Sequence, residues 1–352
     1  MEKAPLEDIK YKYGVVLRGQ ENVGIIYWQV KKFSLSKSLN IHSHGKIDKV
    51  YTAVKKLGAK LINDNLLVVG NVSLTGDYGY RFCPSVDESM HTQLVHAASK
   101  AIIKLAKSQG IKIKTIMVKD FELSPDKLSS KFDHLEYTPY SADPTMIVDI
   151  DPEWKNFDDY LAAMKSKARV RVKRAKKLGQ AFTVKTLSLD DLKKHGAKIY
   201  DLYLKIAAYS TFNLFTLHPD YFVSLKESLG DAVDIFGVYL DGQFVAFYST
   251  IRDGDQMHGH FLGYEQSLNK EYQLYLNMLY WLMEMAINNG VSSLELSRTA
   301  LEIKSSIGAE PHDLAVYTHA HNRYLNRLMK RVVPYFIPDN TWKARSPFKA
   351  KS

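Results

Sequence analysis

Hydrophobic and polar positions alternate in a definite order between Asp234 and Tyr317. Two alternating runs flank Asp241-Gly242, which supplies the positive φ of a tight turn, so a β-hairpin is predicted there. A third strand follows, and then a helix that is apolar almost all round and ends at Gly290. The predicted elements are Ile235–Leu240, Gln243–Ile251, Gln256–Gly263, Tyr272–Asn288, Val291–Ser297, the short helix Ala300–Ile307 and Leu314–Tyr317.

The first part of the chain predicts the same order of elements. A hairpin, a strongly apolar strand, a glycine-containing loop and a helix ending at Gly110 are followed by a strand, a short helix starting at Ser124-Pro125 and further strands. The repeat is one of element order, which predicts two copies of one α/β unit packed side by side, with a boundary near Asp151-Pro152. The predicted elements are Tyr11–Arg18, Val23–Phe33, helix Lys46–Leu57, Leu66–Leu74, helix Asp87–Ser108, Ile111–Val118, His134–Tyr137 and Thr145–Ile150.

A helical segment separates the two units. Glu153–Leu178 is predicted to be one helix whose apolar face packs, while eight positive charges lie within the 13 residues from Lys165 to Lys177. Further helices are predicted at Leu189–Ala207, His218–Leu229 and Asn322–Val333. We expect the tail after Pro334 to lie along the surface or to be loose. The predicted domains are therefore 1–150, 151–321 beginning with the basic helix 153–178, and a C-terminal helix and tail at 322–352.

Composition narrows the class of protein. The chain has 352 residues, of which 45% are hydrophobic and 24% charged, as in ordinary globular proteins with substantial cores. Cys83 is the single cysteine, which excludes an internal disulfide and a thiolate metal cluster and favours a reducing cytoplasm. The polar N-terminus and the lack of any run near ~20 apolar residues predict neither a secretory signal nor a membrane span. The net charge of +10 favours anionic partners such as coenzyme A, nucleotides, RNA or lipid headgroups.

Two segments carry a resemblance to a known family. Tyr160-Leu161 with the basic run from Ser166 to Ala175 resembles the first helix of the FemAB-like, BioF2-like acyltransferases of the GNAT (GCN5-related N-acetyltransferase) superfamily. The segment from Leu294 to Pro311 is similar to the late strand and short helix of that family. The resemblance implies an α/β (α+β) fold made of tandem GNAT-like acyl-CoA N-acyltransferase units, with mixed, mostly antiparallel sheets flanked by helices.

The resemblance also implies where an acyl-CoA, such as acetyl-CoA, would bind. In GNAT folds the strand before the long helix, here Gln256–Gly263, offers backbone groups to the pantetheine, and the helix N-terminus holds the pyrophosphate. The implied cofactor-binding residues are Gly263, Lys270 and Tyr272. The turn Glu265–Tyr272 lacks glycine, whereas the loop Thr75–Arg81 of the first unit has two, so which half holds a cofactor stays open. In the aminoacyl-transferring branch of the family the donor is a charged tRNA, which needs no such loop.

Transfer to an amine requires a base, a proton source and a group that stabilises the oxyanion. His258, His260, Tyr264 and Glu295 lie on the strands that would line the opening of the sheet, and alternation predicts the first three on one face. Tyr317 lies on the last strand. These five are the candidate catalytic residues. The alternatives are ordinary strand-face histidines, packing tyrosines and a glutamate paired with a lysine, and two histidines without a third ligand predict no metal site.

Candidate substrate-binding residues follow the end of a strand, where sites of α/β folds gather. The guanidinium of Arg298 suits phosphate or carboxylate, and an ion pair with Glu302 is the alternative. The basic run is either a solvated helix face or an anion site, and its lack of aromatic residues favours a phosphate-bearing donor or acceptor over sequence-specific nucleic-acid binding. The candidates are Arg298, Glu302, Lys304, Arg169, Arg171 and Arg174.

Together these features predict a cytoplasmic N-acyltransferase of FemAB/GNAT type. It would transfer an acyl or aminoacyl group to an amine of an anionic acceptor by direct attack, because Cys83 lacks an obvious histidine partner. The site is expected between the two units. Two alternatives remain: a tRNA-dependent aminoacyltransferase for a cell-envelope precursor, and a non-catalytic GNAT-like module that binds an anion. The sequence indicates no particular oligomeric state.

Overall fold

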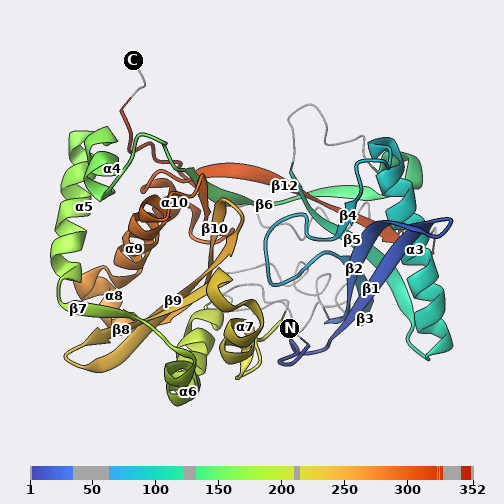
Figure 1. Ribbon diagram of the computed structural model, residues 1–352, viewed down its shortest axis with the longest axis horizontal. Helices are drawn as coiled ribbons and strands as arrows, with labels where there is room; N and C mark the ends of the chain where they lie inside the picture. The colour runs from blue at the N-terminus through green and yellow to red at the C-terminus, as the bar shows by residue number, and fades with distance from the viewer. Residues whose placement is uncertain are drawn as a thin grey trace, which may run out of the picture.

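A single twisted sheet runs through the computed structural model, which describes residues 2–34, 63–122, 132–209, 215–322 and 342–349 together with 324, 326 and 327. Within these residues the sheet has twelve strands: eleven follow the order β1-β2-β3-β5-β12-β6-β11-β10-β9-β8-β7, and the twelfth, β4, pairs with β2 (Figure 1). The predicted helix Lys46–Leu57, the predicted helix start at Ser124-Pro125 and most of Asn322–Val333 lie outside the described residues.

The first half of the chain, residues 1–150, follows the predicted order. Its long helix begins where the Asp87 side chain accepts a hydrogen bond from the Ser89 N–H, which satisfies a backbone donor of the first turn. A strand at His134–Tyr137 was a wrong prediction, because a single 3-10 turn occupies Asp133–Leu135. The elements are β1 Ile9–Arg18, β2 Glu21–Ser34, β3 Asn63–Val69, β4 Tyr80–Phe82, α3 Glu88–Ser108, β5 Ile113–Glu122, η1 Asp133–Leu135 and β6 Thr138–Asp149.

The second half, residues 151–321, confirms the predicted hairpin, strand, long helix, strand, short helix and strand. The long helix starts two residues later than predicted, because Gln273 has a left-handed backbone with φ 51° and separates it from a short preceding helix. The elements are α4 Phe157–Ala163, α5 Ser166–Gly179, β7 Phe182–Thr186, α6 Leu189–Ala207, α7 Tyr221–Leu229, η2 Gly230–Ala232, β8 Val233–Leu240, β9 Gln243–Asp253, β10 Gln256–Tyr264, α8 Gln266–Tyr272, α9 Leu274–Asn288, β11 Ser293–Glu295, α10 Leu301–Ser305 and β12 Glu310–Ala320.

The predicted helix Glu153–Leu178 is two helices, α4 and α5, and the break is made by the C-terminal segment. The backbone of Met164 is extended and forms a β-bridge with Phe348. The Lys165 N–H donates to the Pro347 carbonyl at 2.8 Å, and the Lys349 N–H donates to the Ala163 carbonyl at 3.1 Å. Residues 342–349 are therefore docked on the protein, which for them agrees with the predicted tail along the surface and not with the loose tail that was the alternative.

The two halves exchange their last strands. β12, from the second half, pairs with β5 of the first, while β6, from the first half, pairs with β11 of the second, and β6 and β12 pair with each other. In Figure 1 these two strands cross between the halves. The chain therefore forms one continuous sheet, which corrects the prediction of two separate sheets packed side by side.

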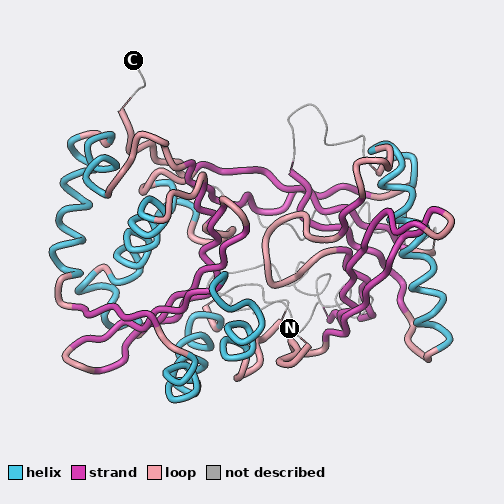
Figure 2. Tube along the Cα trace, in the orientation of Figure 1, coloured by secondary structure: helices cyan, strands magenta, loops and turns pink. Residues whose placement is uncertain are grey.

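Helices cover both faces of the sheet in the second half. One core packs α5 and α9 on residues such as Val238 and Met257, and another packs α6 and α7 on Ile235 and Phe247. In the first half α3 covers the sheet (Figure 2). No helix among the described residues has the length and hydropathy that crossing a membrane requires. The polar groups described next lie in the second half, where the pairing of β10 with β11 ends.

Candidate functional site

The parallel strands β10 and β11 separate in the middle of the sheet. Their pairing ends at His258 and Glu295, while β10 continues to Tyr264. A register shift between Gly259 and Leu262 marks a bulge in the β9–β10 ladder, and the buried Ser249 hydroxyl there donates to the Phe261 carbonyl and accepts from its N–H. Beyond His258, β10 is therefore no longer paired with β11. β-Bulges are common next to active sites, where they change the direction in which side chains point.

A hydrogen-bonded cluster lies where the two strands part. Glu295 accepts from the Thr145 hydroxyl and, at 2.7 Å, from the Ser297 N–H. The Glu295 carboxylate also lies 3.4 Å from His258 Nδ1, and His258 Nε2 lies 3.2 Å from the Tyr78 hydroxyl. Because a carboxylate only accepts, the neutral His258 carries its hydrogen on Nδ1 and accepts at Nε2. This arrangement orients a histidine for proton transfer.

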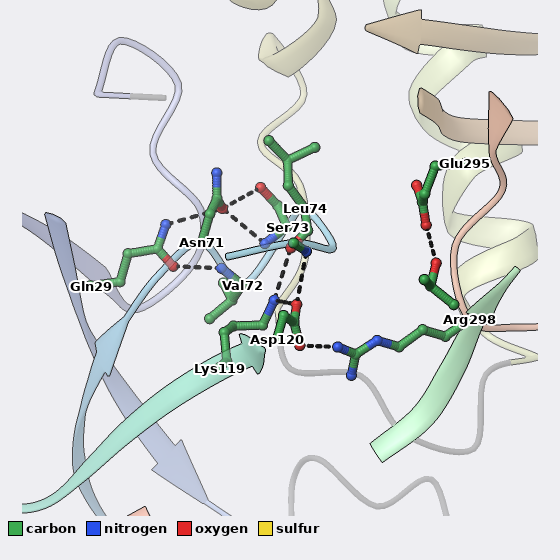
Figure 3. Close-up of polar contacts among 11 residues, drawn as sticks. Gln29, Asn71, Val72, Ser73, Leu74, Lys119, Asp120, Glu295 and Arg298 are labelled. Carbon is green, nitrogen blue, oxygen red and sulfur yellow. Dashed lines mark hydrogen bonds and ion pairs between the residues drawn. The ribbon is translucent and has the colours of Figure 1, made fainter. Parts of the chain in front are cut away.

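A second cluster surrounds Asp120, which is 1% exposed and has a left-handed backbone with φ 65° (Figure 3). Its carboxylate forms ion pairs with Lys119 and with Arg298 of the other half, and it accepts from the Gly76 N–H at 3.2 Å. Lys119 also donates to the Leu74 carbonyl at 2.8 Å. Burial lowers the pKa of Arg298 to about 10, and burial followed by the charge of Arg298 lowers the pKa of Lys119 well below its usual range. One carboxylate thus serves a buried lysine and a partly buried arginine.

Lys304 of α10 is a further buried cation at this place. Its ammonium group donates to the Ser297 carbonyl at 3.3 Å, and the residue is 4% exposed. Burial lowers the pKa of Lys304 to about 8, against a smaller opposing effect of the Glu295 charge. Ser297 and Ala300 both have positive φ, at 62° and 56°, in the segment that links β11 to α10. Such backbone strain gathers at sites that need fixed geometry.

A basic cavity of about 490 Å³ lies on the α5 and α9 side of the sheet. The N-terminus of α9 contributes to its wall. The Gln273 side chain does not cap that helix, whereas the Asn269 side chain accepts from the Tyr275 N–H of its first turn at 2.9 Å. The dipole of the helix start and three basic side chains of α5 both favour an anion. The lining residues are Lys167, Val170, Arg171, Arg174, Asn269, Gln273, Leu276 and Ile303. Charge and helix terminus fit the diphosphate of a coenzyme A or a phosphate of a nucleic acid.

Four of the residues predicted for the site are brought together: His258, Glu295, Arg298 and Lys304. His260 lies on the same strand face as His258, but its Nε2 bonds to the Tyr221 hydroxyl at 2.9 Å. Burial, and next the neighbouring His258, lower the pKa of His260 to about 3, so it stays neutral. Arg171 and Arg174 line the cavity, whereas Arg169 donates to the Ser166 hydroxyl at 3.4 Å.

The structure places other predicted residues elsewhere. Tyr264 packs beside Tyr275 on the α9 side, because the bulge shifts the alternation and corrects the prediction that it shares a face with His258. Tyr317 lies in the aromatic core of the first half, with its ring 5.9 Å from that of Phe121.

Glu302 pairs with Arg345 of the docked tail rather than with Arg298. Gly263 is a packing contact, since a Cβ there would come within 2.6 Å of the Leu202 backbone in α6. Lys270 and Tyr272 lie on α8, where the ring of Tyr272 packs against Phe182.

Sequence reasoning missed the partners that come from the first half and from β6. Tyr78, Asp120 and Thr145 contact His258, Arg298 and Glu295 only because the halves exchange strands. A signal for part of this was present, because Lys119-Asp120 follows directly after a predicted strand and Tyr78 lies in the glycine-containing loop.

Comparison with known proteins agrees with this geometry. Residues 163–312, from the end of α4 into β12, match the family model described as "Acetyltransferase (GNAT) domain". The solved structure of FemX is similar with a TM-score of 0.57 and 14% identity, covering 92% of this chain and 90% of that one. A tandem GNAT protein from the clavulanic acid biosynthesis pathway gives 0.51 and 12%, covering 91% and 86%. No curated protein sequence matches. Residues 163–312 are therefore similar to GNAT acetyltransferase domains, and the whole chain shares its fold with FemX and with this tandem GNAT protein.

Proposed function

We propose that the protein is an N-acyltransferase whose reaction takes place where β10 and β11 part. The observation that carries the proposal is the placement of the Glu295-bound His258 at the end of the β10–β11 pairing, in a domain whose opposite face holds a basic cavity. Met257 packs into the α9 core, so His258, the next residue, points to the other face. The donor and the acceptor therefore approach from opposite faces of the sheet.

The residues have distinct roles in this proposal. His258 accepts a proton from the acceptor's amine at Nε2, while Glu295 holds the imidazole through Nδ1–H and stabilises the imidazolium that forms. Arg298 keeps guanidinium donors for an anionic group of the acceptor, and Lys304 adds positive charge where the carbonyl oxygen becomes negative. Cys83 is exposed, and its thiol donates to the Asn22 carbonyl instead of contacting a residue of this cluster, which supports direct attack rather than a thioester on the protein.

An acyl-CoA is the donor that we infer first. Arg171 and Arg174 with the α9 N-terminus would hold its phosphates, and the bound cofactor supplies a thioester carbonyl for the amine to attack. One of the similar structures is described as a form without acetyl-CoA, which makes acetyl-CoA the first ligand to test. The division of the chain at residue 151 and the location in the cytoplasm remain expectations from the sequence.

A charged tRNA is the second candidate donor, and the outer flank of α5 favours it. The lining of a cavity of about 480 Å³ there includes Lys173, Lys176 and Lys177 beside the single acidic residue Asp158, and Lys176 pairs with Glu284. The first cavity lies on the other flank of α5 and is also basic. Basic side chains on both flanks of the helix could contact several phosphates of one nucleic-acid backbone. A tRNA donor predicts binding that weakens with salt and no affinity for coenzyme A.

Thermal-shift measurements with acetyl-CoA, longer acyl-CoAs, coenzyme A and tRNA separate these cases. A ligand at one hundred times its Kd stabilises the folded protein by about 2.7 kcal/mol. Arg171→Ala should reduce the shift of the bound donor, and Arg169→Ala is the matched control on the same helix, because it does not line the cavity. If no ligand of the panel shifts the transition, the non-catalytic alternative is favoured.

The chemical step is tested separately with His258→Gln. We expect the rate to fall by roughly 100-fold or more while the donor's thermal shift is retained, because the base acts only in the transition state. An unchanged rate with a genuine donor and acceptor would remove His258 from the mechanism.

A further inference from the structure

The loop formed by residues 70–79 belongs to the first half, yet it lies on the β10 strand of the second. Val72 and Leu74 pack into the α6 and α7 core, and Tyr78 reaches His258. The loop is also held from beneath, because Asp120 accepts from the Gly76 N–H and Lys119 donates to the Leu74 carbonyl. This loop therefore brings a first-half side chain onto the proposed base of the second half.

The position of Tyr78 coincides with the position that an acceptor's amine must take. Nδ1 of His258 is engaged by Glu295, so the nitrogen that can receive a proton is Nε2. The Tyr78 hydroxyl lies 3.2 Å from that nitrogen, and burial followed by the charges of Asp253 and Glu295 raises the pKa of Tyr78 to about 12. The phenol therefore stays protonated at neutral pH and donates to the same lone pair that an amine would use.

We propose that Tyr78 is a gating residue, which occupies the acceptor's place at His258 and is displaced when the acceptor's amine arrives. This inference rests on the proposed function and names a positioning residue for it. With a donor bound and no acceptor present, the base stays covered, so water is not activated there. His258 would therefore accept a proton from the acceptor's amine but not from water.

The links around Asp120 indicate which acceptors open the gate. One carboxylate oxygen of Asp120 pairs with Arg298 and the other accepts from Gly76. An anionic group of the acceptor that binds Arg298 competes with Asp120 and so loosens the support of the loop. Gly76 has φ 133°, and a Cβ there would lie 2.6 Å from the Tyr78 ring, so the ring rests on a backbone that only glycine allows. The gate therefore selects an acceptor that carries an amine and an anion together.

Site-resolved modification of histidine with diethyl pyrocarbonate tests the gate without any donor. His258 and His260 fall in one tryptic peptide between Arg252 and Lys270, so mass spectrometry compares them within one sample. Tyr78→Phe should raise the modification rate of His258 about fivefold, the factor expected for the loss of one neutral hydrogen bond. Tyr78→Ala, which also removes the ring, should raise it further, while His260 keeps its rate because its partner is Tyr221.

Tyr80→Phe is the matched control, because this tyrosine lies close by in β4 and packs against Phe82 instead of His258. Equal His258 rates in wild type and in both Tyr78 variants would overturn the gate. A parallel rise of His258 and His260 would also overturn it, because Tyr78 would then hold the whole segment in place. Hydrolysis of acetyl-CoA without acceptor should increase in Tyr78→Phe. If no hydrolysis is seen in either protein, the proposed donor is wrong, and the modification rates still decide on the gate.

Discussion

Lys304 shows how much a single buried charge matters in this site. The residue is buried, its ammonium group donates to the Ser297 carbonyl, and burial disfavours its charged form. Of the residues that the sequence identified here, His258 and Glu295 lie within predicted strands, Arg298 directly follows one, and Lys304 lies in the predicted short helix. Tyr78 and Thr145 could not be predicted, because their contacts depend on strand pairing between distant segments. The bulge that turns Tyr264 away depends on the Ser249 hydroxyl, which leaves no periodic signal in the sequence.

The pKa of Lys304 gives a prediction for stability against pH. Between its folded pKa of about 8 and its usual 10.5, the unfolded chain holds a proton that the folded protein has released. Unfolding free energy contributed by this group therefore rises with pH across that window, by about 3 kcal/mol in total. Lys304→Met lacks this rise, so its stability relative to wild type should decline from pH 7.5 to 10.5. Urea denaturation at several pH values measures the difference, and parallel pH profiles of the two proteins would contradict it.

At the scale of elements, the docked segment 342–349 defines the start of α5. Its backbone pairs with Ala163 and Lys165, and Phe348 packs against Trp154 and Tyr160, with ring centroids 5.5 and 5.8 Å apart. Arg345 adds an ion pair with Glu302 of α10. The segment thereby fixes two helices that line the cavity. The sequence left open whether the tail lies along the surface or is loose, because these contacts are made by backbone groups and one ring and produce no hydrophobic period.

Phe348→Ala tests this docking. The ring also lies against Gly308, where a Cβ would come within 2.3 Å of it, so its removal leaves a gap between α4 and the sheet. We expect a loss of about 2 kcal/mol, less than for a fully buried phenylalanine. Ser346→Ala is the control, because Ser346 is exposed and contributes its carbonyl to Lys165 through the backbone. Equal thermal midpoints of the two variants would show that the docking adds nothing to stability.

For the whole molecule, the exchange of β6 and β12 decides whether the halves are independent. The sequence predicted the repeat from element order, since hairpins, glycine stops and apolar helices are local features. It did not predict the exchange, because the pairing of β5 with β12 joins segments about 190 residues apart along the chain. Each half therefore lacks a neighbour for an inner strand when it is alone.

We expect the two halves to unfold together. Trp28 lies in the core of the first half and Trp281 packs against the core of the second. In variants that keep Trp28 or Trp281 as the single tryptophan of the chain, the urea midpoint by fluorescence should coincide with the midpoint by circular dichroism of the same variant, because neither half retains a complete sheet without the other. Midpoints that differ clearly would show that the halves unfold as separate domains.

Because β12 is synthesised last among the strands, the exchange also affects folding of the chain during translation. β5 is synthesised long before its partner, and at about 5–20 residues per second the delay is on the order of 10–40 s. During that time the nascent chain presents an open strand edge with unpaired amides, which is a template for pairing with other chains. We therefore expect the β5 edge to pair with other chains more readily in the nascent chain than in the finished protein, until translation has passed residue 320.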